Sequence, residues 1–281
     1  MKICVIGTGT MGGGIVQTFA QAGHEIWMKG RSQTSIDKTL QGITKGLSRW
    51  VQKEKMTEAQ QREILGRIHP TLSFEAIKES DLLIEAIAED MEIKKEMLKK
   101  LDEVCKPEAI LATNTSSLSI TELSTVSQHP ERVVGMHFFN PVPLMKLVEI
   151  IKGQLTDSAV HDRVYQLAQE IGKTPVTVNE APGFVVNRLL IPMINEGIGA
   201  LADGVATKEA IDEAMKLGAA HPMGPLALAD LIGLDVCLAI MEVLHREFGD
   251  DKYRPHPLLR KMVRANLLGR KNGIGFYDYR R

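Results

Sequence analysis

A glycine-rich stretch near the N-terminus has the residue types and spacing that bind the pyrophosphate of a dinucleotide. It follows the apolar run Ile3–Ile6, precedes a predicted helix, and consists of Gly7, Thr8, Gly9, Thr10, Met11 and Gly12. In such a motif the first glycine forms the tight turn, the second lets the backbone approach the pyrophosphate, and the third allows close helix–strand packing. The N-terminus of the helix attracts the phosphate charge. The alternative is a glycine-rich turn without a ligand, but the strand–helix context favours the dinucleotide site.

His137 is a candidate for acid–base chemistry. It stands at the end of a predicted strand, and open α/β sheets place their ligands at the carboxyl ends of strands. An imidazole has an unperturbed pKa near 6.5, which suits proton exchange around neutrality. A lone histidine after a strand is otherwise more often a hydrogen-bonded structural residue.

The end of the second predicted strand carries residues that distinguish NADP from NAD. In folds that select NAD, an acid about 20 residues past the glycines binds the ribose hydroxyls. Here Gly30 holds that place, followed by Arg31 and Ser32, while Glu25 stands at the wrong end of the strand. Glycine leaves room for a 2′-phosphate, and Arg31 and Ser32 offer hydrogen-bond donors to it. Lys29 contributes unless strand alternation turns it away. The pattern predicts a preference for NADP(H), with NAD as the weaker alternative.

Alternating strands and helices are predicted over the first two thirds of the chain, which places these residues at the edge of a sheet. The apolar runs are Ile3–Ile6, Glu25–Met28, Leu82–Ala86, Ile110–Thr113, Val133–His137, Leu147–Ile151 and Pro175–Val178. Helical periodicity fills the intervals. This alternation predicts an α/β fold, a Rossmann-type, doubly wound and mostly parallel sheet with helices on both faces.

Strand signals nearly vanish after Pro182-Gly183, so a smaller all-helical domain is expected to follow. Predicted helical stretches are Phe184–Ala202, Lys208–Gly218 capped by Thr207, Leu226–Phe248 and Leu258–Leu268. We expect residues 1–182 to form the dinucleotide-binding domain and residues 183–281 a domain for dimerisation and substrate binding. The first of these helices is apolar almost all round, which is typical of a helix buried at an interface. A homodimer through the helical domain is therefore expected.

The amino-acid composition limits the kinds of partner that we expect and indicates a cellular location. Hydrophobic residues make up 44% of the chain and the net charge is −1, so nothing draws the whole molecule to nucleic acid or to a membrane surface. Any anionic ligand needs a local basic cluster. The three cysteines, Cys4, Cys105 and Cys237, lie far apart without metal-site spacing, which predicts no metal and no disulfide framework, and a cytoplasmic location. We interpret the N-terminal apolar run as a strand rather than a signal peptide.

Several segments together resemble the 3-hydroxyacyl-CoA dehydrogenases, and among them the bacterial 3-hydroxybutyryl-CoA dehydrogenases. The segments are Asn114–Ser117, His137–Pro141, Glu149, Pro182–Arg188 and Gly269–Tyr277. The likeness covers essentially the whole chain. It implies reversible hydride transfer between the nicotinamide cofactor and C3 of (S)-3-hydroxybutyryl-CoA or acetoacetyl-CoA, in fatty acid or butanoate metabolism.

The resemblance also implies roles for individual residues. Glu149 would hold the tautomer of His137 and stabilise its imidazolium. Ser116 and Asn187 would hydrogen-bond the substrate oxygens; the alternatives are that Ser116 caps a helix beginning near Ile120 and that Asn187 bonds only a backbone group. Cofactor contacts beyond the glycine motif and the Gly30 turn are carried over to Glu89, Lys94, Asn140 and Lys271.

A basic cluster between the second and third predicted strands resembles the one that meets the phosphates of coenzyme A. Its members are Arg49, Lys53 and Lys55, and a solvated helical face is the equal alternative. Three other functions compete with the main one. A broader-chain 3-hydroxyacyl-CoA dehydrogenase would use NAD. A β-hydroxyacid dehydrogenase of the 6-phosphogluconate type would use a catalytic lysine. A non-catalytic dinucleotide-binding protein would not need the His–Glu pair.

Overall fold

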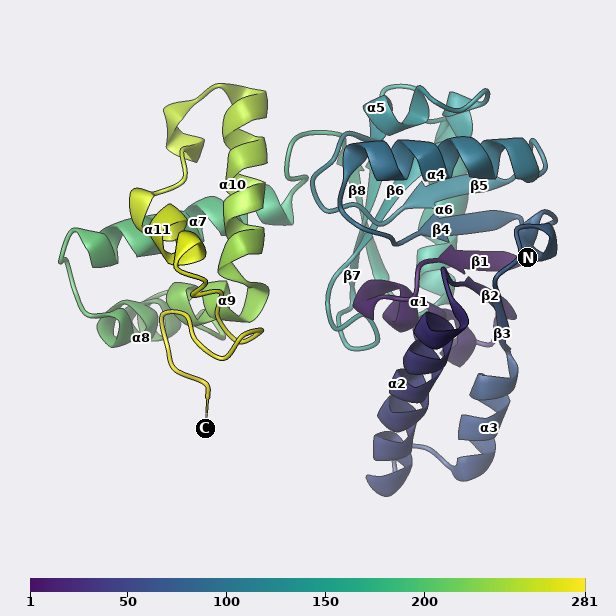
Figure 1. Cartoon of the computed structure of the whole chain (residues 1–281), viewed down its shortest axis with the longest axis horizontal. Helices are drawn as coiled ribbons and strands as arrows, with labels where there is room; N and C mark the ends of the chain where they lie inside the picture. The colour runs from purple at the N-terminus through teal and green to yellow at the C-terminus, as the bar shows by residue number, and fades with distance from the viewer. Residues whose placement is uncertain (281) are drawn as a thin grey trace. The chain divides into compact units, whose positions relative to one another are not determined.

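Eight strands form a single sheet in the order β3-β2-β1-β4-β5-β6-β7-β8 (Figure 1). All neighbouring strands are parallel except β6 and β7, which pair antiparallel. The strands are β1 (Ile3–Ile6), β2 (Ile26–Lys29), β3 (Ile68–Thr71), β4 (Leu82–Glu85), β5 (Ile110–Thr113), β6 (Val133–Phe138), β7 (Leu147–Lys152) and β8 (Thr174–Asn179). The strand order reverses between β1 and β4, the point at which open α/β sheets bind ligands. This computed structural model describes residues 1–280.

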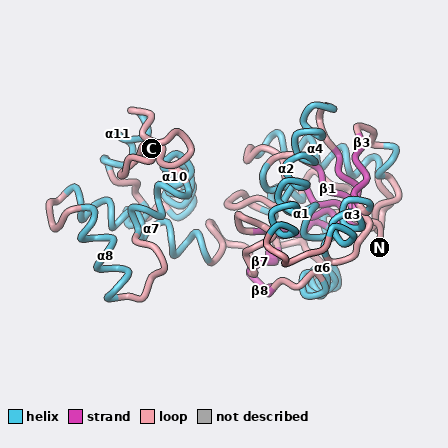
Figure 2. Tube along the Cα trace, turned by 90° about the horizontal axis from the view of Figure 1, so that it is seen from below, coloured by secondary structure: helices cyan, strands magenta, loops and turns pink. Residues whose placement is uncertain are grey.

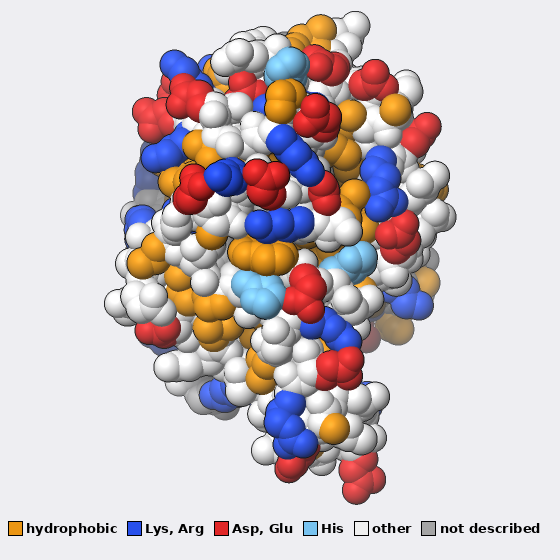
Figure 3. Space-filling view, turned by 90° about the vertical axis from the view of Figure 1, so that its right-hand side faces the viewer, with side chains coloured by type: hydrophobic (Ala, Val, Ile, Leu, Met, Phe, Trp, Pro, Cys, Tyr) orange, Lys and Arg blue, Asp and Glu red, His pale blue; other side chains and the backbone are white. Residues whose placement is uncertain are grey.

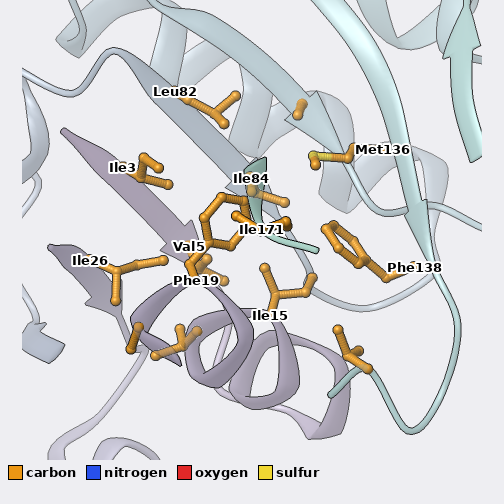
Figure 4. Close-up of a cluster of buried hydrophobic side chains, with 14 of the residues drawn as sticks. Ile3, Val5, Ile15, Phe19, Ile26, Leu82, Ile84, Met136, Phe138 and Ile171 are labelled. Carbon is orange, nitrogen blue, oxygen red and sulfur yellow. The ribbon is translucent and has the colours of Figure 1, made fainter. Parts of the chain in front are cut away.

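Helices flank the strands, as Figure 2 shows for this part of the chain. They are α1 (Thr10–Gln21), α2 (Gln33–Gln52), α3 (Glu58–Gly66), α4 (Met91–Val104), α5 (Ile120–Ser124) and α6 (Ser158–Glu170), with short 3₁₀ turns η1 (Glu75–Ile77) and η2 (Pro130–Arg132). In the core, Ile15 and Phe19 of α1 lie against Val5, Ile84 and Met136 of the sheet (Figure 4). The predicted fold class, a doubly wound sheet followed by a helical domain, is confirmed.

The second compact unit, Pro182–Arg281, is helical; the first ends at Ala181. Its helices are α7 (Val186–Ala202), α8 (Lys208–Gly218), α9 (Pro225–Ile232), α10 (Leu234–Phe248) and α11 (Pro257–Arg264), with a 3₁₀ turn η3 (Asp251–Tyr253). Buried Asp230 of α9 fastens the C-terminal segment, because its carboxylate accepts the backbone N–H groups of Phe276 and Tyr277 at 2.9 Å. Among the described residues, no helix is long and apolar enough to cross a membrane.

The structure corrects the expected elements at three places. The helix expected over Leu258–Leu268 is α11, which already ends at Arg264. Strand β3 was not predicted, because it is short and contains Pro70, and proline in a sheet is confined to edge strands of this kind. The stretch predicted as helical from Leu226 to Phe248 is two helices, separated at Gly233, whose φ of 106° an L-residue rarely adopts. The other predicted strands agree with the structure to within one residue at each end.

Candidate active site

The antiparallel register of β6 and β7 places His137 directly opposite Glu149. Opposed residues in such a pair project from the same face of the sheet. The Nδ1 atom of His137 lies 2.8 Å from Oε2 of Glu149, and both side chains are buried, with 6% and 1% of their surface exposed. Since Nδ1 faces the carboxylate, proton exchange with a ligand is directed to Nε2, the other ring nitrogen.

The end of β6 is fastened to the end of β5. The side-chain Oδ1 of Asn114, the residue after β5, accepts the backbone N–H of Phe138 at 2.9 Å. This hydrogen bond joins the last residue of β6 to the segment that follows β5. The ring of Phe139 packs on the imidazole of His137 with centroids 4.4 Å apart. Asn114 belongs to one of the segments that resemble the family, but its role in holding this strand was not predicted.

Ser116 follows β5 and is bonded to a carboxylate. Its backbone N–H and its hydroxyl both donate to Oε1 of Glu89, at 2.7 and 2.9 Å, and the Thr115 hydroxyl donates to the same oxygen at 2.7 Å. Ser119, not Ser116, caps helix α5 by accepting the N–H of Glu122. The alternative role of Ser116 as a helix cap is therefore wrong.

Lys94 is buried beneath Glu89 and bridges two carboxylates. Its ammonium donates to both oxygens of Glu85, at 2.7 and 2.9 Å, and lies 3.5 Å from Oε2 of Glu89. Only 1% of Lys94 is exposed. Its charge therefore acts on the site through the partly exposed Glu89 carboxylate beside it. Glu85 itself was missed by sequence reasoning, although a carboxylate ending an apolar strand is a signal that could have identified it.

The glycine motif fits a dinucleotide, with a different reason for glycine at each position. A Cβ on Gly7, whose φ is 120°, would lie 2.4 Å from the carbonyl oxygen of Ala86, and a Cβ on Gly12 would lie 2.2 Å from that of Gly7. These two glycines are required by the turn and by its packing. A Cβ on Gly9 would meet no protein atom within 4 Å. Glycine at position 9 leaves this space free of any side chain, which suits the close approach of a ligand's phosphates.

The turn after β2 carries an exposed guanidinium next to a small residue. Arg31 is exposed and, within residues 1–280, makes no hydrogen bond or salt bridge, whereas Ser32 caps α2 by accepting the N–H of Ser35 at 3.2 Å. Lys29 is buried with its ammonium on the carbonyl of Gly30 at 3.1 Å and over the ring of Phe74. The Lys29 ammonium is therefore engaged inside the protein and is not exposed beside Arg31.

The basic cluster lies far from this edge of the sheet. Arg49 is in the last turn of α2, Lys53 caps its C-terminus, and Lys55 follows in the turn to α3. Because α2 has 20 residues, its two ends lie roughly 30 Å apart. A shallow depression of about 350 Å³ beside Lys55 marks the tip of this helical hairpin. On the face drawn in Figure 3, cationic and anionic side chains are interspersed.

Two of the predicted site residues belong to the second unit. Asn187 is a partly buried residue in the first turn of α7 and has polar partners. Lys271 is exposed and forms a salt bridge with Asp235 at the start of α10. Asn140, in the first unit, is exposed directly after β6. Residues 1–280 contain no group of three His, Cys, Asp or Glu side chains arranged to hold a metal ion.

Comparison with known proteins places both units in one family. Residues 2–181 match the family model of the 3-hydroxyacyl-CoA dehydrogenase NAD-binding domain, and residues 183–279 match that of the 3-hydroxyacyl-CoA dehydrogenase C-terminal domain. The chain therefore belongs to the 3-hydroxyacyl-CoA dehydrogenase family, whose members are oxidoreductases that act on acyl-CoA thioesters with a nicotinamide dinucleotide.

Individual relatives match over the whole chain. A 3-hydroxybutyryl-CoA dehydrogenase of Clostridioides difficile is 63% identical over 279 residues, covering 99% of each chain. A probable 3-hydroxybutyryl-CoA dehydrogenase of Bacillus subtilis is 54% identical, covering 99% of this chain and 97% of the relative. The crystal structure of an (S)-3-hydroxybutyryl-CoA dehydrogenase from Ralstonia eutropha superimposes with a TM-score of 0.97 at 48% identity and covers 100% of this chain and 99% of that one.

Proposed function

We propose that the chain is a 3-hydroxybutyryl-CoA dehydrogenase that transfers hydride reversibly between NADP(H) and C3 of (S)-3-hydroxybutyryl-CoA or acetoacetyl-CoA, with His137 as the acid/base. The observation that carries the reaction is the buried His137–Glu149 pair at the carboxyl edge of the sheet. The names of relatives that match 99% of this chain support the substrate.

The proton steps follow from the partners of each side chain. During oxidation, Nε2 of His137 takes the proton of the substrate hydroxyl, and Glu149 stabilises the imidazolium that forms. The Ser116 hydroxyl donates to Glu89 in this structure. Because the single proton of the substrate hydroxyl goes to His137, Ser116 would turn to donate its hydrogen bond to the substrate oxygen. Asn187 donates to a substrate oxygen. A bound nicotinamide supplies the hydride acceptor, and reduction reverses these steps.

The preference for NADP(H) rests on the end of β2. Gly30 brings no carboxylate that would repel a 2′-phosphate, and the exposed Arg31 guanidinium is available to bind one in a bidentate manner. The Ser32 oxygen accepts the N–H of Ser35 and keeps its own proton to donate. The first turn of α2 contains no acidic residue, which favours an anion at its N-terminus.

Further contacts are proposed from the same resemblance. The cofactor pyrophosphate would lie on the glycine motif, and the nicotinamide ribose near Glu89, with Lys94 acting through that carboxylate and Asn140 and Lys271 as additional contacts. Arg49, Lys53 and Lys55 would bind the coenzyme A phosphates. The α2–α3 hairpin supports this proposal because its tip gathers the three exposed cations.

We also propose a homodimer through residues 183–281, with residues 1–182 as the dinucleotide-binding domain. An apolar side chain near the start of helix α7 is open to solvent, since Leu189 is 69% exposed. Apolar surface of this kind is typical of an interface. A sedimentation equilibrium experiment tests the dimer, and a monodisperse monomer at micromolar concentration contradicts it.

Two alternative functions remain distinguishable. An NAD-dependent enzyme of broader chain length agrees with the name of the family model, which is an NAD-binding domain. A lysine-dependent β-hydroxyacid dehydrogenase is disfavoured, because Lys94, the buried lysine whose ammonium lies 3.5 Å from Glu89, is held by both oxygens of Glu85.

Steady-state kinetics test the proposal. The rates of NADPH and NADH oxidation would be measured with acetoacetyl-CoA and with longer 3-ketoacyl-CoAs. We expect the highest kcat/KM with acetoacetyl-CoA and NADPH. A higher kcat/KM with NADH would reject the cofactor preference, and a higher value with the longer thioesters would reject the short-chain assignment.

A further inference from the structure

The glycine at the end of β2 is not required by its own backbone. Gly30 is absent from the glycines of positive φ in this chain, so the backbone at this position accepts any L-residue. The space around it does not. A Cβ on Gly30 would lie 2.4 Å from Cγ1 of Ile36 and 2.9 Å from its Cδ1, and 3.2 Å from Cγ2 of Thr8. The main obstacle to a larger residue at position 30 is therefore the side chain of Ile36.

Ile36 cannot easily give way. It lies in the first turns of α2, is 1% exposed and belongs to the main hydrophobic core. Its backbone N–H donates to the carbonyl of Ser32, and a capping box between Ser32 and Ser35 fixes the start of the helix. A β-branched side chain in a helix also has one strongly preferred rotamer. Both the backbone and the side-chain torsion hold Ile36 against Gly30.

The obstacle at Gly30 differs in kind from those at Gly7 and Gly12. There a Cβ would collide with backbone carbonyl groups, of Ala86 and of Gly7 respectively, and no side-chain substitution relieves a backbone collision. At Gly30 the two closest atoms, both under 3.0 Å from the added Cβ, belong to the side chain of Ile36. A second substitution, at position 36, can therefore remove the obstacle.

We propose that Ile36 is a specificity-determining residue, which excludes an acidic side chain from the end of β2 by filling its volume. The acid at this place is the group that selects the ribose hydroxyls of NAD and would repel a 2′-phosphate. Ile36 acts through position 30 and needs no contact with the cofactor. This inference rests on the proposed preference for NADP(H), and it adds that exchanging residues 30 and 31 alone does not produce an enzyme selective for NADH.

A double-mutant cycle between Gly30→Asp and Ile36→Ala tests the proposal. The dissociation constants of NADH and NADPH would be measured by fluorescence titration without substrate, and the midpoint of thermal unfolding by calorimetry. Gly30→Asp alone should lower Tm by roughly 4–10 °C through overpacking and should not improve NADH binding. With Ile36→Ala added, we expect NADH to bind about tenfold more tightly than to the parent, through the new hydrogen bonds. The Tm cost of Ile36→Ala should be smaller in the Gly30→Asp background than in the parent.

Two further variants secure the interpretation. Ile43→Ala removes the same side chain from the core face of the same helix, and Ile43 is not among the neighbours of Gly30, so its effect should be additive with Gly30→Asp. Gly30→Ala carries the Cβ without a charge, and its Tm should show the same coupling to Ile36→Ala even if the Gly30→Asp variant does not fold.

The outcomes separate this inference from the proposed function. Tighter binding of NADH than of NADPH by the parent would reject the proposed cofactor preference, while the Tm cycle would still measure the coupling between positions 30 and 36. Additive Tm effects at these positions, or tight NADH binding by Gly30→Asp alone, would overturn the role of Ile36.

Discussion

Two buried hydrogen-bonded pairs flank strand β6, one just before its start and one near its other end, and they have opposite surroundings. Just before β6, Arg132 forms a salt bridge with Asp102 and donates to the backbone carbonyls of Lys106, Pro107 and Ala109 at 2.7, 3.1 and 3.2 Å. Near the other end of the strand, His137 meets Glu149. The first pair is surrounded by backbone acceptors, and the second lies at the edge of the sheet where ligands bind.

From this difference we expect the first pair to support the fold and the second pair to support the proposed proton transfer. The Asp102 carboxylate receives Arg132, the Ser127 hydroxyl at 2.5 Å and the N–H of Gln128 at 2.8 Å, so its hydrogen-bonding capacity is used within the protein. The imidazole at the other end lies at the carboxyl edge of the sheet, and its Nε2 atom is the nitrogen that we propose exchanges a proton. Removing a partner from the first pair should therefore destabilise the fold, whereas removing His137 should stop the reaction.

The largest effect is expected from His137→Ala. Turnover should fall by roughly 10²–10⁴-fold, the usual range for loss of a general acid–base group, while cofactor binding measured by fluorescence stays intact. His161→Gln is the matched control, since His161 is a buried histidine of the same unit, bonded to Asp162 and Thr177. Near-normal turnover of His137→Ala, or an equal loss in the control, would contradict the proposed acid/base role of His137.

Asp102→Ala should show the reverse pattern at the other end of the strand. Leaving the Arg132 cation buried without its partner should reduce the free energy of unfolding by about 3–5 kcal/mol. Urea denaturation measures this loss, and active-site titration of the remaining folded enzyme should give a kcat close to that of the parent. A stable variant with impaired turnover would show that the two ends of β6 do not differ as described.

Glu89→Gln should have a smaller effect on the reaction. The amide oxygen still accepts the Ser116 and Thr115 groups, but the charge that faces Lys94 is lost. We expect kcat/KM to fall by about tenfold, the value of one charged hydrogen bond. Glu92→Gln, an exposed neighbour paired with Lys95, is the control and should leave kcat/KM unchanged. Full activity of Glu89→Gln would remove this carboxylate from the site.

The smallest effects are opposite pH dependences of stability at two aspartates. Burial opposes ionisation of Asp102, but its hydrogen bonds from Ser127, Gln128 and Arg132 prevail and hold its pKa below the ordinary 3.8. Its stabilising contribution is complete above pH 3.8 and is lost as the pH falls through the lower folded-state pKa. Burial raises the pKa of Asp230 above 3.8, despite hydrogen bonds from Phe276 and Tyr277, so stability is lost there as the pH rises through the raised pKa.

Urea titrations at several pH values check this contrast. As the pH rises, the advantage of the parent over Asp102→Asn should grow below about pH 3.8 and then stay level, whereas its advantage over Asp230→Asn should shrink above about pH 3.8. Slopes of the same sign would contradict the distinction between the two aspartates.

The sequence was sufficient for features that depend on local pattern. The apolar periodicity identified seven of the eight strands, because a strand buried on both faces is a continuous apolar run. Thr207 was recognised as the cap of α8 because capping depends on the residues of a single turn; its hydroxyl accepts the N–H of Ala210. The pairing of His137 with Glu149 was carried over from the family resemblance, and the structure supplies its physical basis, the antiparallel register of β6 and β7.

Only the tertiary structure decided what surrounds those residues. Sequence alone predicted that Gly30 leaves room for a phosphate, yet the atoms that forbid a larger side chain there belong to Ile36, on the following helix. Lys94 was expected at the cofactor, and the fold buries it on Glu85, a residue of the preceding strand. Hydrophobic periodicity and capping are properties of neighbouring residues, whereas free volume and the partner of a buried charge arise only when separate elements pack together.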